Sequence, residues 1–435
     1  MFKPVIYDFD NILEVQQQLA PQTYERIDFS HTPERFRTRL GDNSKMQRNS
    51  RIKAMLSDPE QVEHFRQLTL MGDPVADACA TLFPQMGFAR ARALLDQALE
   101  HGIDAVADAP DELKVFMATI EHVPQWVDFE RIDRATRLLR PFSAIFDQLV
   151  TRAAFMITYV NGYQGLPMLI TGALSGDAAS RRIRETTSTL RMAVLPGALR
   201  RDGEAFKSAA KVRIMHAMVR YNLLHNSTIW DPAVYGVPIP QVDQMGAALT
   251  PVYQLAKRAL KAGRPFTRGE GDVVMLFRYM SYLLGLHQQF LSDDPQTIVD
   301  TWQMVQATLP HKFDPRSLDL NDATLAAYLQ KDRSIVNRLV HQLDQRASRV
   351  VYRFLVGDKT AAMMKASPGV ADYAALLLWG GPLAAKYAGI SALRMAPPLR
   401  KRIDHWAGNE IRSQLQLKVN PVAYKTDASV YKQAL

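Results

Sequence analysis

The chain has 435 residues, which allows two or three domains of roughly 100–200 residues, or one large domain. Apolar residues make up 47% and charged residues 22%, a globular composition that excludes a disordered chain. Cys79 is the only cysteine, so an internal disulfide and a multi-cysteine zinc site are excluded. The net charge of +9 permits contact with acidic lipid or nucleic acid, but charge of this size is common in proteins that bind neither.

Helix signals dominate the sequence, because apolar residues recur at three- and four-residue spacing in most segments. Proline or glycine separates most of these segments, and alternating strand-like runs are scarce. The predicted fold class is therefore all-α, as one large helical domain that packs in the style of a globin. The pattern predicts helices over residues 61–70, 73–82, 88–99, 111–120, 142–160, 180–195, 204–224, 272–286 and 323–355, and further helix in the Ala- and Leu-rich 371–394.

The chain ends differ in composition from its middle. Residues 1–57 are polar and basic with weak periodicity, so we expect an N-terminal arm that wraps on the body or is mobile. Residues 58–425 would form the helical domain, and residues 426–435 a C-terminal tail. No internal repeat or low-complexity linker divides the domain further.

Targeting and membrane-spanning signals are weak. No apolar run follows Lys3, so we expect no signal peptide. The longest uncharged stretch, over residues 153–176, is interrupted by Asn161-Gly162 and Pro167 and is a poor bilayer span. We therefore expect a cytoplasmic protein.

The signatures of several common enzymes are missing from the sequence. It has no G-x-x-x-x-G-K-[ST], no G-x-S-x-G and no H-E-x-x-H, and no Glu has the His three residues later that di-iron bundles require. The basic arm and Arg400-Lys401-Arg402 are not interleaved with aromatic residues, so we expect no nucleic-acid partner.

A predicted helical hairpin over residues 180–226 is the most informative part of the chain. Its helices are joined by a short break at Pro196-Gly197 and Asp202-Gly203, which makes them antiparallel neighbours. The first helix carries three polar residues on one face, namely Arg182, Glu185 and Thr186. The second carries His216 with two same-face arginines, Arg213 and Arg220. Reflecting the second helix about the break places the polar trio level with His216.

One imidazole, nearby arginines and a facing polar trio in a helical core suit a haem site. A single His can hold the iron axially, arginines can pair with the propionates, and a polar cluster can interact with bound dioxygen. Positive charge on Arg213 and Arg220 would also favour the neutral, ligating form of His216. The alternative is that His216 is a hydrogen-bonded core histidine and that the arginines are solvated.

Six motifs, in order from about Gly72 to Leu286, resemble those of the MpaB-like oxygenase family, which includes the latex clearing proteins (rubber oxygenases). They are Gly72-Asp-Pro-Val-Ala-Asp77, Val123-Pro-Gln-Trp-Val-Asp128, Leu169-Ile-Thr-Gly-Ala-Leu174, Arg182-x-x-Glu-Thr186, Val212-Arg-Ile-Met-His-Ala-Met-Val-Arg220, and Trp230-Asp-Pro with Gly236-Val-Pro-Ile-Pro-Gln-Val-Asp243. The resemblance implies an all-α protein that holds haem b between core helices on the His of V-R-x-x-H, which is His216 in this chain.

The resemblance also implies a function. Rubber-cleaving members cleave isoprenoid C=C bonds with dioxygen, so we expect a haem-dependent oxygenase with a small lipophilic, isoprenoid or other alkene, substrate. Arg182 and Thr186 would belong to the distal-side polar helix. The alternatives are a haem protein of this fold with peroxidase-type or hydroxylating chemistry, a haem sensor or carrier, and an all-α module that has lost haem.

Glu185 departs from the rubber-cleaving branch, which has Lys at this position, and the departure argues against polyisoprene as the substrate. Arg182 stands three residues earlier on the same helix face. Because a buried carboxylate is costly unless it is paired, we expect Arg182 to hold Glu185 ionised. Glu185 would then leave the iron open to dioxygen.

A possible membrane contact lies near the C-terminus. The uncharged residues 373–385, followed by Lys386 and the basic residues 394–402, could rest on a bilayer surface. A buried helix is the favoured interpretation of this segment. The sequence leaves the oligomeric state open.

Overall fold

The computed structural model describes residues 11–41, 45–143, 150–171, 177–330 and 332–418, and every regular element within these ranges is a helix. The prediction of an all-α fold is confirmed. Within the described ranges the chain divides into two compact units. The first contains residues 11–132 and 199–310, and the second contains residues 133–198 and 311–418. The predicted domain boundaries stay predictions, and the expected tail over residues 426–435 lies outside the described residues.

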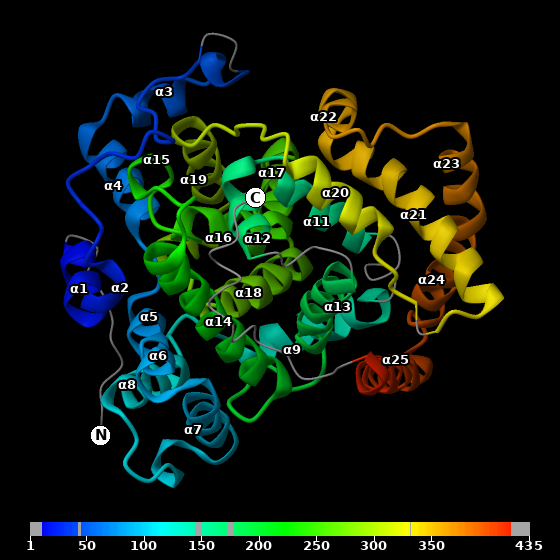
Figure 1. Ribbon diagram of the computed structural model, residues 1–435. Coiled ribbons are helices and arrows are strands. Elements are labelled where there is room, and N and C mark those ends of the chain that lie inside the picture. The colour runs from blue at the N-terminus through cyan, green and yellow to red at the C-terminus, as the bar shows by residue number, and fades with distance from the viewer. Residues whose placement is uncertain (1–10, 42–44, 144–149, 172–176, 331, 419–435) are drawn as a thin grey trace. The chain divides into compact units, whose positions relative to one another are not determined.

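The first unit is built from many short helices and the 23-residue α14, and its α-helices are labelled in Figure 1. They are α1 (Ile12–Leu19), α2 (Pro21–Tyr24), η2 (Lys45–Arg48), α3 (Ser50–Leu56), α4 (Pro59–Leu70), α5 (Pro74–Ala80), α6 (Leu82–Met86), α7 (Phe88–His101), η3 (Ile103–Ala105), α8 (Asp111–Glu121), α14 (Glu204–Asn226), α15 (Pro232–Tyr235), α16 (Gln241–Ala248), α17 (Thr250–Lys261), α18 (Arg268–Leu283), η6 (Gln288–Phe290) and α19 (Pro295–Thr308). Helix α9 (Phe129–Leu139) runs across the boundary between residues 132 and 133.

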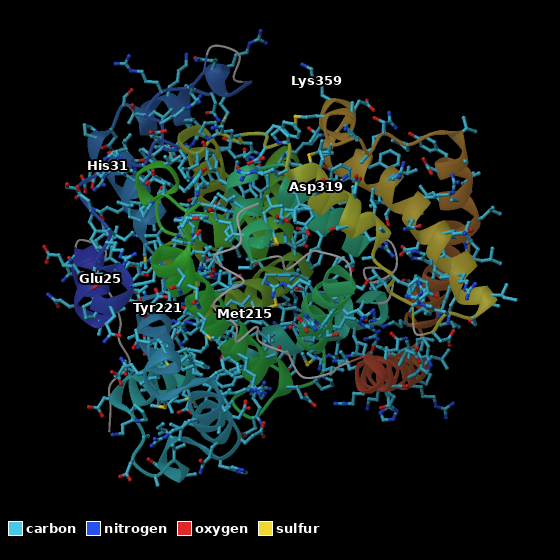
Figure 2. All side chains as sticks on the ribbon, in the orientation of Figure 1. Glu25, His31, Met215, Tyr221, Asp319 and Lys359 are labelled. Carbon is cyan, nitrogen blue, oxygen red and sulfur yellow. The ribbon has the colours of Figure 1, made fainter. Side chains whose placement is uncertain are left out.

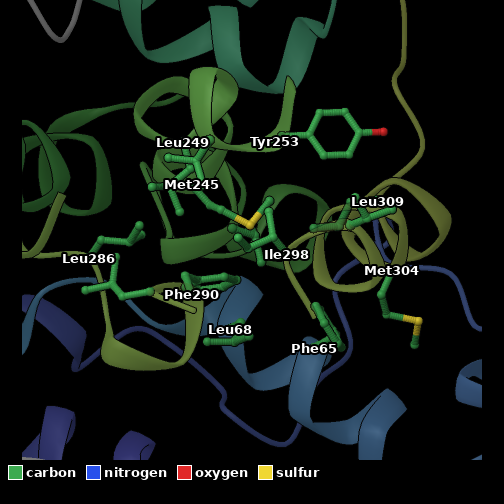
Figure 3. Packing of buried hydrophobic residues seen from close by; sticks show 14 of the residues in the cluster. Phe65, Leu68, Met245, Leu249, Tyr253, Leu286, Phe290, Ile298, Met304 and Leu309 are labelled. Carbon is green, nitrogen blue, oxygen red and sulfur yellow. The ribbon is translucent and has the colours of Figure 1, made fainter. Parts of the chain in front are cut away.

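The apolar core of the first unit lies where α4, α16, α17 and α19 meet. Figure 3 shows side chains from these helices, among them Phe65, Met245, Tyr253 and Ile298. Tyr253 stacks on Trp302 with ring centroids 4.5 Å apart, which joins α17 to α19.

The segment expected to be an arm packs on the first unit over its described residues. Ile12, Tyr24 and Ile52 are fully buried there. Gln16 donates a hydrogen bond to the carbonyl of Leu70 (2.9 Å) and accepts one from the backbone N–H of Gly72 (2.8 Å). These contacts hold the arm against the end of α4 and the start of the first predicted motif.

The second unit contains the helices between residues 140 and 192 and the C-terminal helices. They are η4 (Arg140–Phe142), α11 (Thr151–Tyr159), α12 (Gly162–Ile170), α13 (Asp177–Met192), α20 (Ser317–Ala326), α21 (Ile335–Val356), α22 (Asp358–Met363), α23 (Val370–Ala375), the π-helical η7 (Leu376–Gly380), α24 (Gly381–Leu393) and α25 (Pro397–Lys418). A buried cluster that includes Met156, Tyr159, Ile183 and Tyr352 joins α11, α13 and α21. Beside it, Arg152 donates from Nε to Asp344 (2.8 Å) and from Nη1 to the carbonyls of Thr324 and Leu325.

Two expectations about the helices are wrong. The helix predicted over residues 323–355 is interrupted between α20 and α21, because Asp332 accepts a hydrogen bond from the backbone N–H of Ser334, which in turn caps α21. The segment over residues 373–385, for which a buried helix was favoured, is helical but largely exposed, with Leu377 and Leu378 at the surface. In the helix predicted over residues 142–160, positions 144–149 lie outside the described residues.

Candidate functional site

The predicted iron ligand, His216, lies near the middle of α14, and Figure 2 labels Met215 and Tyr221 on the same helix. Arg213, Ile214, Ala217 and Arg220 of this helix are buried. His216 is half-buried at the edge of that face, and its neighbours Val212, Met215 and Val219 are also half-buried. The imidazole therefore projects from an apolar surface of the helix that is only partly covered.

Arg213 is held by Asp73 at the start of α5. The carboxylate accepts from Arg213 Nε and, at 2.8 Å, from Arg213 Nη2, and both side chains are buried. The same carboxylate caps α5 by accepting from the backbone N–H of Ala76 (3.3 Å), with Pro74 at the first helical position. Asp73 is thus the N-cap of α5, and its ion pair with Arg213 adds a second role that fixes α14 against α5.

Arg220 forms a second buried pair about two helical turns further along α14. Its Nη1 donates a hydrogen bond to one carboxylate oxygen of Asp77 in α5. The hydroxyl of Tyr24, in the arm, donates a hydrogen bond to the other oxygen of that carboxylate. Burial raises the pKa of Asp77 to about 6, although the nearby Arg220 guanidinium opposes the shift. Burial and the Asp77 charge also raise the pKa of Tyr24 well above its ordinary value, so the phenol stays protonated as the donor.

Gly72 and Gly285 make room for these pairs. A Cβ atom on Gly72 would collide with the Tyr24 hydroxyl and lie 2.6 Å from Arg220 Nε. A Cβ atom on Gly285, which has φ of +88°, would collide with Asp73 and lie 2.7 Å from Arg213 Nε. Only glycine at both positions lets the backbone approach the buried charges this closely.

The last predicted motif closes around the same charges. Arg220 donates from Nε to the carbonyl of Pro238 (3.0 Å) and from Nη2 to that of Ile239 (2.9 Å). Ile239 has φ of +49°, which is rare for a β-branched residue, so these contacts hold a strained turn in place. Gln241 then donates to the carbonyls of Gly72 (2.7 Å) and Gly285 (2.9 Å).

Three of the six motifs, those containing residues 72–77, 212–220 and 236–243, thus form one polar network in the first unit. Outside the network core, Asp243 accepts two hydrogen bonds from the buried Arg35 of the arm, at 2.9 and 2.7 Å. Arg213 pairs with Asp73 and lies 5.7 Å from the ring centroid of Phe116, and Arg220 contacts Asp77 and two backbone carbonyls. Their expected role as propionate partners stays a prediction, while the role that the contacts display is to hold α14 rigidly.

Arg213 and Arg220 are each paired with a buried carboxylate and are not isolated positive charges near His216. We expected positive charge on Arg213 and Arg220 to favour the neutral imidazole. Each guanidinium instead faces a buried carboxylate, so each pair carries no net charge and supplies little field at His216.

The predicted polar trio lies on α13 of the second unit. Arg182 and Glu185 are half-buried, whereas Thr186 is exposed. Burial lowers the pKa of Arg182, and the charge of Glu185 and the buried phenol of Tyr159 oppose the shift. Glu185 forms an ion pair with Arg181, at 3.9 Å from Nε to Oε1. Burial raises the pKa of Glu185 against the opposing charges of Arg182 and its neighbours, so these arginines only partly compensate for burial.

Helix α13 is anchored to the turn that follows α20. Arg184 donates from Nη1 to the carbonyl of Tyr328 (2.9 Å), and the backbone N–H of Tyr328 donates to the Ser180 hydroxyl (2.9 Å). At the other end of α13, Arg191 donates to Gln414 of α25. The face with Arg182 and Glu185 is therefore carried by a helix fixed at both ends.

The predicted halves of the site belong to different compact units. The structure brings Arg213 and Arg220 together around α5, and it brings Arg182 and Glu185 together on α13. That the trio faces His216 stays a prediction. Within the described residues, no three His, Cys, Asp or Glu side chains gather as a metal site, which does not bear on a haem iron held by one His.

Sequence reasoning missed the carboxylates that neutralise the arginines. Asp77 had no predicted role beyond its place at the end of the first motif. Tyr24 lies in the segment expected to be an arm. One signal was available for Asp77, because it is the single charged residue in Pro74–Ala80, where every other residue is Pro, Val, Ala or Cys. A lone acid in such an apolar helix predicts a buried partner of opposite charge.

Comparison with known proteins identifies the fold and the family. Residues 148–385, more than half of the chain, match the sequence family described as ER-bound oxygenase mpaB/B′/rubber oxygenase, catalytic domain. A solved structure of the latex clearing protein LCP in the closed state aligns with a TM-score of 0.57 and 18% identity, over 79% of this chain and 90% of that chain. No curated protein sequence matches the chain. The helical fold is thus that of the latex clearing protein, and the chain belongs to the mpaB and rubber oxygenase family of catalytic domains.

Proposed function

We propose that the chain is a haem-b-dependent oxygenase that uses dioxygen to cleave a C=C bond of a lipophilic substrate, an isoprenoid or another alkene. Membership of the oxygenase family supplies the reaction class. The observation that carries the proposal is the position of His216 on a helix that two buried ion pairs, Arg213–Asp73 and Arg220–Asp77, fix in place.

His216 would suit a ligand of the haem iron in its chemistry and its surroundings. A ligating imidazole has to be neutral, accessible on one side and held in orientation. The half-buried row of Val212, Met215 and Val219 beside it supplies an apolar surface. The same surface suits a lipophilic substrate, because apolar side chains line most sites for such molecules.

The residues of α13 have supporting parts in this proposal. Haem, when bound, supplies the reaction with dioxygen. Arg182 can donate charge-assisted hydrogen bonds to an oxygen atom, and its neighbour Glu185 balances that charge. Glu185, whose pKa burial raises, can also hold or release a proton in this proposal.

Haem titration of the purified full chain tests the ligand assignment. The chain should bind haemin with a Soret band, and His216→Ala should lose that band while its helical circular dichroism is kept. His225→Ala is the matched control, because His225 lies on the same helix but stacks on Tyr221, with centroids 4.2 Å apart. A His216→Ala protein with a full Soret band would refute the assignment of His216 as the haem ligand.

Oxygen uptake tests the reaction. Squalene should stimulate oxygen consumption and give carbonyl products detected by mass spectrometry, whereas its saturated analogue squalane should not. Hydroxylated products from either probe would indicate hydroxylating chemistry instead. Haem binding without any oxygen uptake on a panel of alkenes would indicate a sensor or carrier.

A further inference from the structure

Exposed apolar side chains are concentrated on the C-terminal part of the second unit. Of the fifteen large apolar side chains that are exposed among the described residues, thirteen lie between residues 335 and 406. Single apolar residues are normal on a protein surface, but a concentration of this kind marks an interaction site.

Helices α23, η7 and α24 form one helical path over residues 370–393 with an apolar outer side. Leu377 and Leu378 are 75% and 68% exposed, and they are consecutive residues of the π-helical η7. The other exposed residues of the path are Val370, Tyr373, Leu393, Lys386 and a series of Ala, Gly and Pro. A surface helix of a globular protein normally turns charged or polar residues outward, and this path turns them outward only at Lys386.

The neighbouring helix α21, which Figure 1 shows beside α23, also carries exposed apolar side chains. Arg353 of α21 donates from Nη1 to the hydroxyl of Tyr373 at 2.6 Å, which places the end of α21 next to α23. The next residue, Phe354, is 70% exposed. We call Phe354, Val370, Tyr373, Leu377, Leu378 and Leu393 the apolar face.

Basic residues flank the apolar face. Lys386 lies 5.7 Å from the ring centroid of the partly exposed Trp406, which joins α24 to α25. Arg400 donates from Nε to the carbonyl of Arg394 at 3.2 Å, and Lys401 and Arg402 beside it are exposed. We call Lys386, Arg400, Lys401 and Arg402 the basic rim.

The charge of the whole segment has the same sign. Residues 335–418 contain 13 Lys and Arg against 5 Asp and Glu, so most of the net charge of +9 lies there. Two copies joined through the apolar face would bring these positive charges together, and that opposes self-association. An anionic surface would be attracted by the same charges.

We propose that the apolar face and the basic rim dock the chain onto the surface of an anionic lipid bilayer. Leu377, Leu378 and Phe354 would enter the boundary between headgroups and acyl chains, and the basic rim would contact the lipid phosphates. Trp406 beside Lys386 suits the headgroup level, where aromatic rings with a polar edge gather. The proposal does not depend on haem binding, so its failure would leave the proposed function untouched.

Vesicle flotation of the full chain tests the proposal. The chain should float with vesicles of phosphatidylcholine and phosphatidylglycerol at low salt, and less with vesicles of phosphatidylcholine alone or at high salt. The double variant Leu377→Ser, Leu378→Ser should lower the partition coefficient by about 100-fold, because two inserted leucine side chains are lost. Val123→Ser, an exposed apolar position outside the face, is the matched control and should bind as the wild type does.

The electrostatic part has its own variants. Lys401→Gln and Arg402→Gln should each weaken binding by about fivefold, whereas Arg90→Gln, an exposed charge of α7, should have little effect. Absence of flotation at low salt, or unchanged flotation of the double leucine variant, would overturn the proposal. Sedimentation that shows a wild-type dimer and a monomeric leucine variant, without vesicle binding by either, would assign the face to a second copy instead.

Discussion

Arg220 donates hydrogen bonds at once to the carboxylate of Asp77 and to the carbonyls of Pro238 and Ile239, so one buried guanidinium joins α14, α5 and the loop before α16. A planar group with five N–H donors can satisfy three partners in one plane, which an ammonium cannot do in the same way. This side chain therefore fixes the helix that carries His216.

Replacing Arg220 with Met should lower the free energy of unfolding by about 3–5 kcal/mol, because it leaves the buried Asp77 without its counter-charge. Urea unfolding followed by circular dichroism measures this. Lys207→Met breaks the more exposed pair with Glu100 (2.5 Å) and should change stability by less than about 1 kcal/mol. Similar losses in the two variants would mean that Arg220 has no special role.

The pH dependence of stability should carry the signature of Asp77. Its pKa is about 6 in the folded chain, against an ordinary value of 3.8, so between these values the folded state holds a proton that the unfolded state releases. This group therefore favours folding as the pH falls through about 6, and the effect reaches at most about 3 kcal/mol. The contribution is lost as the pH rises above the folded value.

Asp77→Asn isolates this contribution, because the variant lacks the titrating group. The difference in unfolding free energy between wild type and variant should move in favour of the wild type by more than about 1 kcal/mol between about pH 7.5 and about pH 5. Other groups, such as His341, whose pKa burial lowers to about 4, titrate equally in both proteins and cancel. A pH-independent difference would contradict the raised pKa.

Gly72→Ala should be destabilising by at least about 1–3 kcal/mol, because the added methyl group would overlap the Tyr24 hydroxyl and crowd Asp77 at 2.8 Å. Thermal unfolding provides the measurement. Gly41→Ala is the control, since a Cβ atom there meets nothing within 4 Å, and it should change stability by less than about 0.5 kcal/mol. If both variants unfold alike, the close approach around Gly72 is not tight.

Glu185 tests the distal part of the proposed function. With haem bound, Glu185→Lys should shift the ferric spectrum toward six-coordinate low spin, because an amine can close the position that a carboxylate leaves open. Glu185→Gln should leave the spin state nearly unchanged while it lowers turnover. Asp202→Lys makes the same charge change at an exposed position and should not alter the spectrum. A wild-type ferric protein that is already low spin with a nitrogen ligand would refute this account.

Local sequence signals predicted individual helices and caps well. The periodicity and the flanking Pro and Gly residues predicted α7, α8 and α14 to within two residues at each end. The helix predicted to begin at residue 73 starts one residue later, as α5. These features depend on neighbours within a few positions, which is the range over which capping and helical periodicity act.

Long-range relationships could not be predicted in the same way. Asp73 and Arg213 are 140 residues apart, and no local spacing indicates that they pair. The exposed position of Leu377 and Leu378 was missed because an apolar helix has the same sequence pattern in a core as on a surface that binds lipid. Predicting either feature needs the identity of the packing partner, which single-chain periodicity does not contain.

The pairs that hold α14 have a consequence for any fragment of this chain. The family match covers residues 148–385 and includes both arginines, but Asp73 and Asp77 lie well before its start. A fragment cut to the matched region would keep two guanidinium groups that the intact chain buries and would discard both counter-charges. Since each pair also closes a loop of about 140 residues, α14 should reach its final position only after the N-terminal helices have folded. During synthesis, Asp73 and Asp77 are therefore made long before the helix that carries their counter-charges.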